Sequence, residues 1–316
     1  MSAEKRDLEK NFISAVIYIN SSSSLTDFEQ FSKKLIDTLG GLFKSFELIY
    51  VDDASPSEYV ATIKKIHIDH SDIAMTILHM SKYQGMELSM NAGRDLAIGD
   101  FVIEFDECIY NFPDDLIEKA YRKCLSDIDI VSCADKAKSK MSSNIFYRIF
   151  NRFSDAESDL RSDNFRIISR RAINRIQALS KTIPYRKALY YESGLNTDTI
   201  EYDSESVSQY RHDRKSKNSR RRLAVDSLVL FTDIGYKCAL ALALIMAFIM
   251  ICVSVYAIIV YVQGIAIVGW TTTMLFLSFA FFGLFVILTI VIKYLSLILE
   301  MIFKKNKYLF RNVEKL

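Results

Sequence analysis

The stretch that decides the fold runs from Ser81 to Asp115, SKYQGMELSMNAGRDLAIGDFVIEFDECIYNFPDD. Apolar residues between Met86 and Ile98 recur close to one face of a helix, so this part is predicted to be helical. Gly99 is then expected to end the helix in the left-handed conformation that glycine adopts at little cost. The apolar run from Phe101 to Phe105 predicts a short buried strand.

Acidic residues stand at the carboxyl end of this predicted strand. They are Glu104, Asp106 and Glu107. In an open α/β sheet, ligands bind just beyond the carboxyl ends of the strands. The three acids are therefore candidates for a ligand site, although an ordinary helix–strand unit followed by a solvated acidic loop would show the same pattern.

Strands and helices alternate on both sides of this stretch. The further predicted strands are 12–19, 46–51, 74–79 and 129–133, and the further predicted helices are 25–39, 59–67 and 115–125. Gly40 and Gly41 are expected to break the first of these helices. An alternation of this kind implies a parallel sheet with right-handed crossovers, so the predicted fold class is α/β.

A second acidic pair, Asp52 and Asp53, follows the predicted strand 46–51. A carboxylate at such a position can accept hydrogen bonds from ribose hydroxyls or from a base N–H. Simple capping of the strand end is the alternative interpretation. The pair is therefore the second candidate site.

These two blocks resemble family 2 glycosyltransferases, inverting enzymes of the GT-A fold that use nucleotide sugars, and especially those that glycosylate polyisoprenyl phosphates. The first block is the Val-Asp-Asp-x-Ser signature at residues 51–55. The second is carried without a gap by Gly85, Glu87, Gly93, Asp95, Gly99, Asp100 and Asp106. The resemblance implies a GT-A domain over residues 1–210, and a donor site made by Ile17, Asn20, Asp52, Asp53, Gly85, Glu87 and Asp106. Ile17 stands where the family has a proline.

The acid motif departs from the family pattern. The family has Asp-x-Asp followed by Leu-Gln-Asp-Pro-Pro-Glu, whereas Cys108 replaces the second Asp here and Tyr110 replaces the Gln. Those two positions usually help to hold the divalent metal, and a thiol is a poor ligand for Mg²⁺ or Mn²⁺. The resemblance therefore implies a weak metal site on Asp106, with Glu107 or Asp114 as candidate substitutes. We expect any activity to depend less on metal than in relatives with the full motif.

Basic residues are the candidates for stabilising a departing diphosphate. Arg166, in the stretch 161–170, matches the family's Gly-Asp-Phe-Arg-Leu-x-x-Arg pattern, although a solvated helix start is the alternative. Arg211, Arg214 and Lys217 resemble the family's Arg-x-x-Arg…Ser-Lys motif in shortened form. Guanidinium and ammonium groups suit a lipid phosphate or a diphosphate. We therefore assign Asp106 and these four cations to the predicted catalytic site.

The C-terminal third has the pattern of a membrane anchor. The basic segment 211–237 includes an amphipathic stretch, 223–237, which predicts an interfacial helix. Two uncharged stretches, about 238–262 and 271–292, are each long enough to span the hydrocarbon layer. A pair of core helices is the alternative. The tail 304–316 is basic again, so both termini and the catalytic domain are expected on the cytoplasmic side of the cell (inner) membrane.

Composition excludes several other classes of protein. The net charge of +2 argues against a nucleic-acid binder. Five cysteines without a CxxC spacing indicate neither a disulfide framework nor a zinc site, and favour a reducing compartment. The N-terminus lacks the apolar core of a signal peptide.

The resemblance implies transfer of a sugar from a UDP- or GDP-sugar to a polyprenyl phosphate of the undecaprenyl type, for cell-surface glycan synthesis or modification. The alternative is a catalytically weak or inactive paralogue that acts as a membrane-bound binding or assembly subunit. The expected partners are the lipid and the membrane. A homo-oligomer, a flippase and a second glycosyltransferase stay open as further partners.

Overall fold

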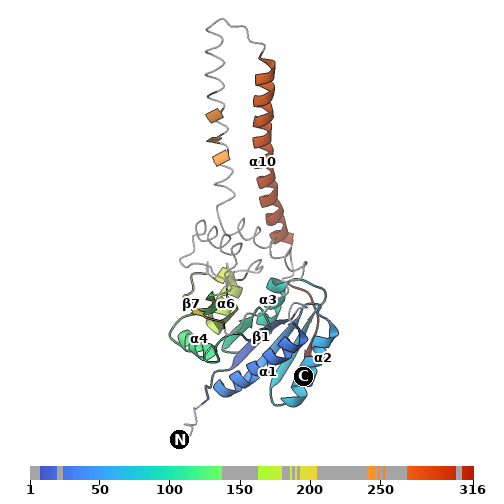
Figure 1. The fold of residues 1–316 in the computed structure, drawn as a ribbon, viewed down its shortest axis with the longest axis vertical. Coiled ribbons are helices and arrows are strands. Elements are labelled where there is room, and N and C mark those ends of the chain that lie inside the picture. Colours follow the sequence, from blue (N-terminus) through green and yellow to red (C-terminus); the bar gives the residue numbers. More distant parts are fainter. Residues whose placement is uncertain are drawn as a thin grey trace. The chain divides into compact units, whose positions relative to one another are not determined.

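The computed structural model describes residues 8–19, 24–136, 163–179, 186, 189–190, 193–204, 241–242, 244–245, 248–249, 252, 269–303 and 308–316. Residue contacts divide the chain into two units (Figure 1). The first contains residues 1–225 together with 305–316, and the second contains residues 226–304. The first unit is therefore made of two segments that are far apart in the sequence.

The first unit is built on one sheet with the described strand order β7-β5-β6-β4-β1-β2-β3-β8. The strands are β1 (Ile13–Ile19), β2 (Phe46–Asp52), β3 (Ala74–Met80), β4 (Phe101–Phe105), β5 (Ile130–Asp135), β6 (Phe165–Ser169), β7 (Thr197–Tyr202) and β8 (Phe310–Lys315). β1 pairs in parallel with β2 and β4, and the pairs β2–β3 and β5–β7 are also parallel. β6 and β8 are antiparallel to their neighbours. The α/β class and the mostly parallel sheet are thus confirmed.

Helices cover both faces of the sheet (Figure 1). They are α1 (Leu25–Leu42), α2 (Ser57–Asp69), α3 (Met86–Leu96), α4 (Leu116–Leu125) and α6 (Arg170–Leu179). α1, α2 and α4 enclose one apolar cluster, and α3 and α6 enclose the other. Successive residues of β1 serve the two clusters in turn, with Ile17 in the first and Val16 in the second, as expected for a strand buried on both faces.

Three glycines behave differently from the sequence-based expectation. α1 continues through Gly40 and Gly41 to Leu42, because glycine weakens a helix by only about 1 kcal/mol and Phe43 beyond it packs into the core. α3 ends earlier, with Ala97 as an extended C-cap. Gly99 is instead required by close packing, since a Cβ there would lie 2.6 Å from the backbone nitrogen of Ser14.

α3 lies unusually close to the centre of the sheet. A Cβ at Gly93 would lie 2.5 Å from methyl groups of both Val16 on β1 and Val51 on β2. A larger residue would therefore push the helix away from the sheet. This close packing brings the first turn of α3 next to the carboxyl ends of the strands, where the predicted acids lie.

The segment 310–315 forms β8, which pairs antiparallel with β3 at the edge of the sheet. This strand differs from the sequence-based prediction, which assigns residues 304–316 to a basic tail. In the second unit, α10 (Trp270–Phe303) contains the whole predicted span 271–292. Within the described ranges, no helix meets the length and hydropathy needed to cross a membrane. The predicted interfacial helix and almost all of the span 238–262 lie outside the described residues.

Candidate functional site

Asp53 follows β2 and holds the loop that leads into α3. One carboxylate oxygen accepts a hydrogen bond from the backbone N–H of Gln84 (2.7 Å), and the other accepts from the Tyr18 hydroxyl (2.8 Å) and the Gly85 N–H (2.9 Å). Gly85 has φ 87° and ψ 158°, a conformation essentially restricted to glycine. Burial raises the pKa of Asp53, and the hydrogen bonds from Gln84, Tyr18 and Gly85 act in the opposite direction. Asp53 therefore fixes the entry to α3.

Asp52 links β2 to the distant C-terminal strand. Its Oδ1 accepts a hydrogen bond from the Ser55 N–H (2.8 Å), and its Oδ2 lies 3.0 Å from Nδ1 of His79 on β3. The other ring nitrogen of His79 lies 3.2 Å from a carboxylate oxygen of Glu314 on β8. One face of the predicted donor loop is thus tied to residues near position 314.

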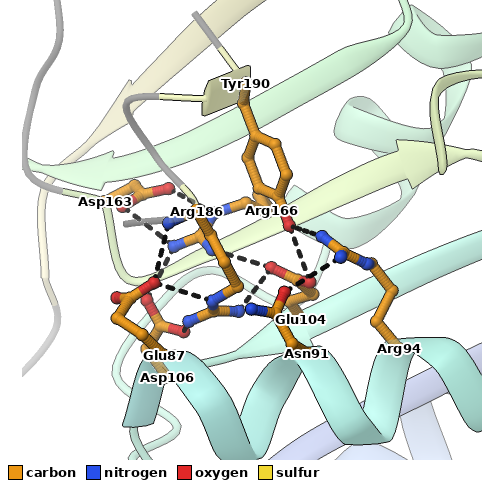
Figure 2. Close-up of polar contacts among 9 residues, drawn as sticks. All are labelled: Glu87, Asn91, Arg94, Glu104, Asp106, Asp163, Arg166, Arg186 and Tyr190. Carbon is orange, nitrogen blue, oxygen red and sulfur yellow. Dashed lines mark hydrogen bonds and ion pairs between the residues drawn. The ribbon is translucent and has the colours of Figure 1, made fainter. Parts of the chain in front are cut away.

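Charged side chains gather in the interior beside Asp106 (Figure 2). The buried arginine network, as we define it, consists of Glu87, Asn91, Arg94, Glu104, Asp106, Asp163, Arg166, Arg186 and Tyr190. α3, β4 and β6 each contribute members, and every side chain in the network is buried. Buried charges are stable only when they are paired and hydrogen-bonded, so each contact in the network has an energetic role.

Arg166 on β6 uses its guanidinium to join three carboxylates. Its Nε lies 2.7 Å from Asp163, one terminal nitrogen lies 2.8 Å from Glu104, and the other lies 2.6 Å from Asp106. Burial alone would lower the pKa of Arg166, but the three carboxylates outweigh it and hold the pKa well above its usual range. Arg166 is therefore a fully paired internal cation. The alternative of a solvated helix start is wrong, because the residue lies in a buried strand.

Arg186 completes the pairing from the opposite side. Its Nε, Nη1 and Nη2 lie 3.0, 2.7 and 2.8 Å from carboxylate oxygens of Glu87, Glu104 and Asp106, respectively. The backbone N–H of Arg186 also donates to Glu87 (2.9 Å). Burial lowers the pKa of Arg186, but Glu104, Glu87 and Asp106 together keep it well above the usual range. Asp106 thus has one arginine on each of its oxygens.

Tyr190 connects Glu104 to the third arginine. Its hydroxyl donates to Glu104 (3.0 Å) and accepts from Arg94 (2.6 Å), while Arg94 also donates to Asn91 (2.9 Å). Burial is the main reason that the pKa of Tyr190 is raised, so the hydroxyl stays protonated at neutral pH. The network therefore extends as a continuous set of hydrogen bonds from Asp163 to Asn91.

The substituted positions of the acid motif point into the protein core. Cys108 is 2% exposed, and its thiol lies 3.3 Å from the backbone oxygen of Tyr18. Burial raises the pKa of the Cys108 thiol, which disfavours the thiolate. The Tyr110 hydroxyl lies 2.8 Å from the Thr38 hydroxyl on α1. Both residues therefore contribute to packing in this structure.

The other predicted site residues fall into three groups. Ile17 is fully buried and belongs to the apolar core. Asp114 is exposed and lies 2.9 Å from Lys34 on α1, and Glu107 is partly buried. Asn20, Arg211, Arg214 and Lys217 lie outside the described residues.

A divalent cation does not fit the described residues in this arrangement. Both oxygens of Asp106 already accept hydrogen bonds from guanidinium groups, and Cys108 supplies no oxygen. Over the described parts of the chain, no group of three or more His, Cys, Asp or Glu side chains is placed to hold a metal ion. The chemistry available at Asp106 is therefore that of ion pairs with arginine.

Sequence reasoning missed Arg94, Arg186 and Tyr190. One signal was present: Glu87, Asn91 and Arg94 recur at helical spacing, which places three polar side chains on the buried face of α3. Arg186 lies in a segment of mixed polarity, YRKALYY, with no regular pattern. Its partners are 80 to 99 residues away in sequence, so local spacing could not identify them.

The comparisons with known proteins agree on one family. The family model described as glycosyl transferase family 2 matches residues 29–190. An uncharacterized glycosyltransferase of Synechocystis sp. is 25% identical over 187 residues, 57% of each chain. A prophage bactoprenol glucosyl transferase homolog of Escherichia coli is 24% identical over 162 residues, 49% of this chain and 52% of the relative. The chain thus spans about half the length of these curated relatives.

One solved structure that was matched to this chain by its fold is a mannosyltransferase of Pyrobaculum calidifontis in complex with GDP-mannose and Mn²⁺. It is 12% identical, covers 94% of this chain and 89% of its own, and has a TM-score of 0.49. At this TM-score the similarity supports no inference about the present chain.

Proposed function

The chain belongs to glycosyl transferase family 2, and from this membership we propose that it is a GT-A enzyme that transfers a sugar from a nucleotide diphosphate sugar to a polyprenyl phosphate. One observation supports the proposed position of the donor site. Asp53 and Asp106 follow β2 and β4, the two parallel neighbours of β1, and both are connected to the first turn of α3, through Gly85 and through Glu87 with Arg186. Strand ends of this kind are the usual ligand sites of α/β sheets.

The lipid acceptor is suggested by relatives named bactoprenol glucosyl transferase, one at 24% identity. In the proposed inverting reaction, an oxygen of the acceptor phosphate attacks C1 of the sugar, and the electron pair of the broken C1–O bond goes to the departing diphosphate. The acceptor is already anionic, so little general-base help is needed. The main catalytic requirement is therefore to stabilise the negative charge of the leaving diphosphate. Arg166 is fully paired with carboxylates, so Arg211, Arg214 and Lys217 are assigned this role.

We further propose that residues 238–262 and 271–292 form a membrane hairpin, with both termini cytoplasmic. The support is the absence of charged residues from both stretches, and the basic residues at the outer flanks. Residues 305–316 belong to the same unit as residues 1–225, so a membrane-crossing insert between them must cross an even number of times. A cysteine introduced at Gly264, in a chain lacking its own cysteines, should react with an impermeant thiol reagent in intact cells. Reaction only after lysis would exclude this topology.

A second candidate function is a membrane-bound binding or assembly subunit without transferase activity. It is favoured by one specific observation: two arginines occupy the carboxylate oxygens of Asp106, and Cys108 points into the core. In such a site both carboxylate oxygens of Asp106 are already bound by arginines of the same chain.

The test is a transfer assay with the full-length chain in membranes. A panel of nucleotide sugars and a polyprenyl phosphate are supplied with Mg²⁺, with Mn²⁺ or with chelator, and donor binding is measured in parallel. We expect transfer that persists in chelator, and we expect Arg211→Ala to lower turnover more than donor binding. Arg220→Ala, in the same basic run, is the matched control and should change little. Donor binding without transfer would favour the binding subunit, and loss of both would contradict the proposal.

A further inference from the structure

The C-terminal strand β8 reaches Asp52 through a single side chain, that of His79. Asp52 and His79 are direct neighbours across the β2–β3 pair, and Glu314 of β8 lies opposite Ile77, two residues before His79. Residues two apart on a strand share a face of the sheet, so the register brings Asp52, His79 and Glu314 to one face. Glu314 therefore lies beside a residue that is 235 positions earlier in the sequence.

The imidazole of His79 is held between two carboxylates. Its Nδ1 lies 3.0 Å from Oδ2 of Asp52, and its Nε2 lies 3.2 Å from Oε2 of Glu314. A neutral imidazole has one N–H and donates to only one of these oxygens, whereas an imidazolium donates to both. The arrangement therefore fits a protonated His79, which Glu314 holds from the side opposite Asp52.

The carboxylates at the two ends of this chain of contacts are also fixed. Oδ1 of Asp52 accepts hydrogen bonds from the Ser55 N–H (2.8 Å) and the Ser55 hydroxyl (2.5 Å). Oε1 of Glu314 lies 2.6 Å from Nζ of Lys64 on α2. An ionised carboxylate has about four acceptor positions, and the contacts given by the described residues fill three of those on Asp52. A ribose hydroxyl or a base N–H would take the fourth.

The loop before α3 is held by the same C-terminal segment, independently of His79. The side-chain oxygen of Gln84 accepts a hydrogen bond from the Leu309 N–H (2.9 Å), and its side-chain NH₂ donates to the Leu309 backbone oxygen. The N–H and the hydroxyl of Ser81 donate to that same oxygen, each at 3.1 Å. The Gln84 N–H in turn donates to Asp53. Both members of the pair Asp52–Asp53 are thus one residue away from the segment 309–314.

We propose that His79 and Glu314 are positioning residues of the donor site, which hold the Asp52 carboxylate in the orientation that receives the ribose or the base of a nucleotide. This inference rests on the proposed donor site at the pair Asp52–Asp53. It extends that proposal, because it assigns part of the site to a strand that follows the second unit in the sequence.

The experiment measures the nucleotide affinity of the full-length chain. UDP and GDP are titrated separately, with Mg²⁺ present, and binding is followed by calorimetry. Glu314→Ala should weaken binding of the nucleotide that wild type prefers about three- to tenfold, as expected for the loss of one hydrogen bond that orients Asp52. Lys315→Ala, which removes the exposed neighbouring charge on the same strand, is the matched control and should bind like wild type.

A conservative variant tests whether the contact with His79 is responsible. Glu314→Gln should bind the nucleotide nearly as tightly as wild type, because its amide donates to Nε2 of His79 and leaves the Nδ1 proton directed at Asp52. Equal losses of affinity in Glu314→Ala and Glu314→Gln would overturn the proposal, since the charge of Glu314 and not its bond to His79 would then be responsible.

A double-mutant cycle separates positioning from a general loss of structure. Asp52→Ala leaves no carboxylate to position, so adding Glu314→Ala should not weaken nucleotide binding further. A loss by the same factor in both backgrounds would overturn the proposal. If Asp52→Ala binds too weakly to titrate, the comparison of Glu314→Ala with Glu314→Gln gives the answer.

Failure of this inference is distinguishable from failure of the proposed function. Wild type that binds neither UDP nor GDP would contradict both. Wild type that binds a nucleotide, together with a Glu314→Ala variant that binds it equally tightly, would overturn the inference and leave the proposed function standing. If Glu314→Ala does not fold, His79→Phe, which keeps a ring but removes both nitrogens, takes its place with the same expected loss of affinity, and unchanged affinity in that variant would likewise overturn the inference.

Discussion

Asp53 and Asp106 occupy equivalent positions, each just beyond a strand that pairs in parallel with β1, yet they are stabilised in different ways. Asp53 is held by neutral donors, two backbone N–H groups and a tyrosine hydroxyl. Asp106 is held by two guanidinium groups. Neutral donors satisfy the geometry of a buried carboxylate but leave its charge uncompensated, whereas guanidinium groups compensate the charge and are themselves trapped by it. The donors to Asp53 thus bring no positive charge to its carboxyl group, whereas the donors to Asp106 do.

The largest expected effect comes from breaking the charge compensation around Asp106. Arg166→Met removes the arginine paired with Asp163 and leaves Glu104 and Asp106 with one arginine, Arg186, in place of two. Loss of one partner of a buried ion pair costs about 3–5 kcal/mol, so we expect the free energy of unfolding to fall by that amount in urea titrations. Arg171→Met removes an arginine that is 63% exposed, and should cost less than about 1 kcal/mol. Equal losses in the free energy of unfolding for the two variants would contradict the distinction between buried and exposed arginine pairs.

An intermediate effect is expected at Asp53. Asp53→Asn keeps the shape but turns an NH₂ group toward donors at Tyr18, Gln84 or Gly85, which should cost about 1–3 kcal/mol. The pH dependence has a definite sign. Because burial raises the pKa of Asp53 above its ordinary 3.8, its contribution is fully present below that value and is lost as the pH rises through the raised pKa.

The advantage of wild type over Asp53→Asn should therefore shrink as the pH is raised from near 4 toward neutrality. Unfolding titrations of both proteins at several pH values measure this difference. An advantage that grows with pH would show that the hydrogen bonds, rather than burial, dominate the pKa of Asp53.

The smallest effect is expected where charge pairing is exposed, at β8. Hydrogen bonds from Lys64 and then His79 lower the pKa of Glu314 below its ordinary 4.5, so the stabilisation is present above that value and is lost as the pH falls through the lowered pKa. Glu314→Gln should cost well under about 1 kcal/mol, seen as faster hydrogen exchange of β8 amides at neutral pH. Glu118→Gln, at another exposed pair, should leave β8 exchange unchanged. If the β8 amides exchange at the same rate in Glu314→Gln and in wild type, this charge pairing does not stabilise β8.

The sequence was sufficient where a residue's environment follows from its neighbours. Apolar runs identified β1, β2 and β4, and the alternation of strands with helices identified α1 and α4. It was insufficient where burial opposes residue type. Three arginines are among the largest fully buried side chains, although arginine is ordinarily exposed: Arg94, Arg166 and Arg186. They can be buried because acids from distant segments balance the positive charge of each arginine, either directly or through a hydrogen-bonded neighbour.

The acid motif contains both kinds of residue in one short segment: those whose environment follows from their sequence neighbours and those whose environment does not. The position of Asp106 beyond β4 followed from the strand pattern, but its pairing with Arg166 and Arg186 did not. Cys108 and Tyr110 were recognised as departures from the family pattern, and the structure shows both packed against core residues. β8 escaped prediction because an edge strand with one exposed face carries little apolar signal, and its pairing with β3 depends on residues some 240 positions earlier.

The return of residues 310–315 to the sheet sets an order of events during synthesis. β3 leaves the ribosome early, but its pairing partner β8 is made only after the roughly 80 residues from 226 to 304. Met80 at the end of β3 and Phe310 at the start of β8 are 230 positions apart, so at translation rates of roughly 5–20 residues per second the edge of β3 waits about 12–46 s for that partner. An uncovered strand edge is open to pairing with other chains. A nascent chain that stalls within residues 226–304 therefore exposes an unfinished sheet, because β8 has not yet been made.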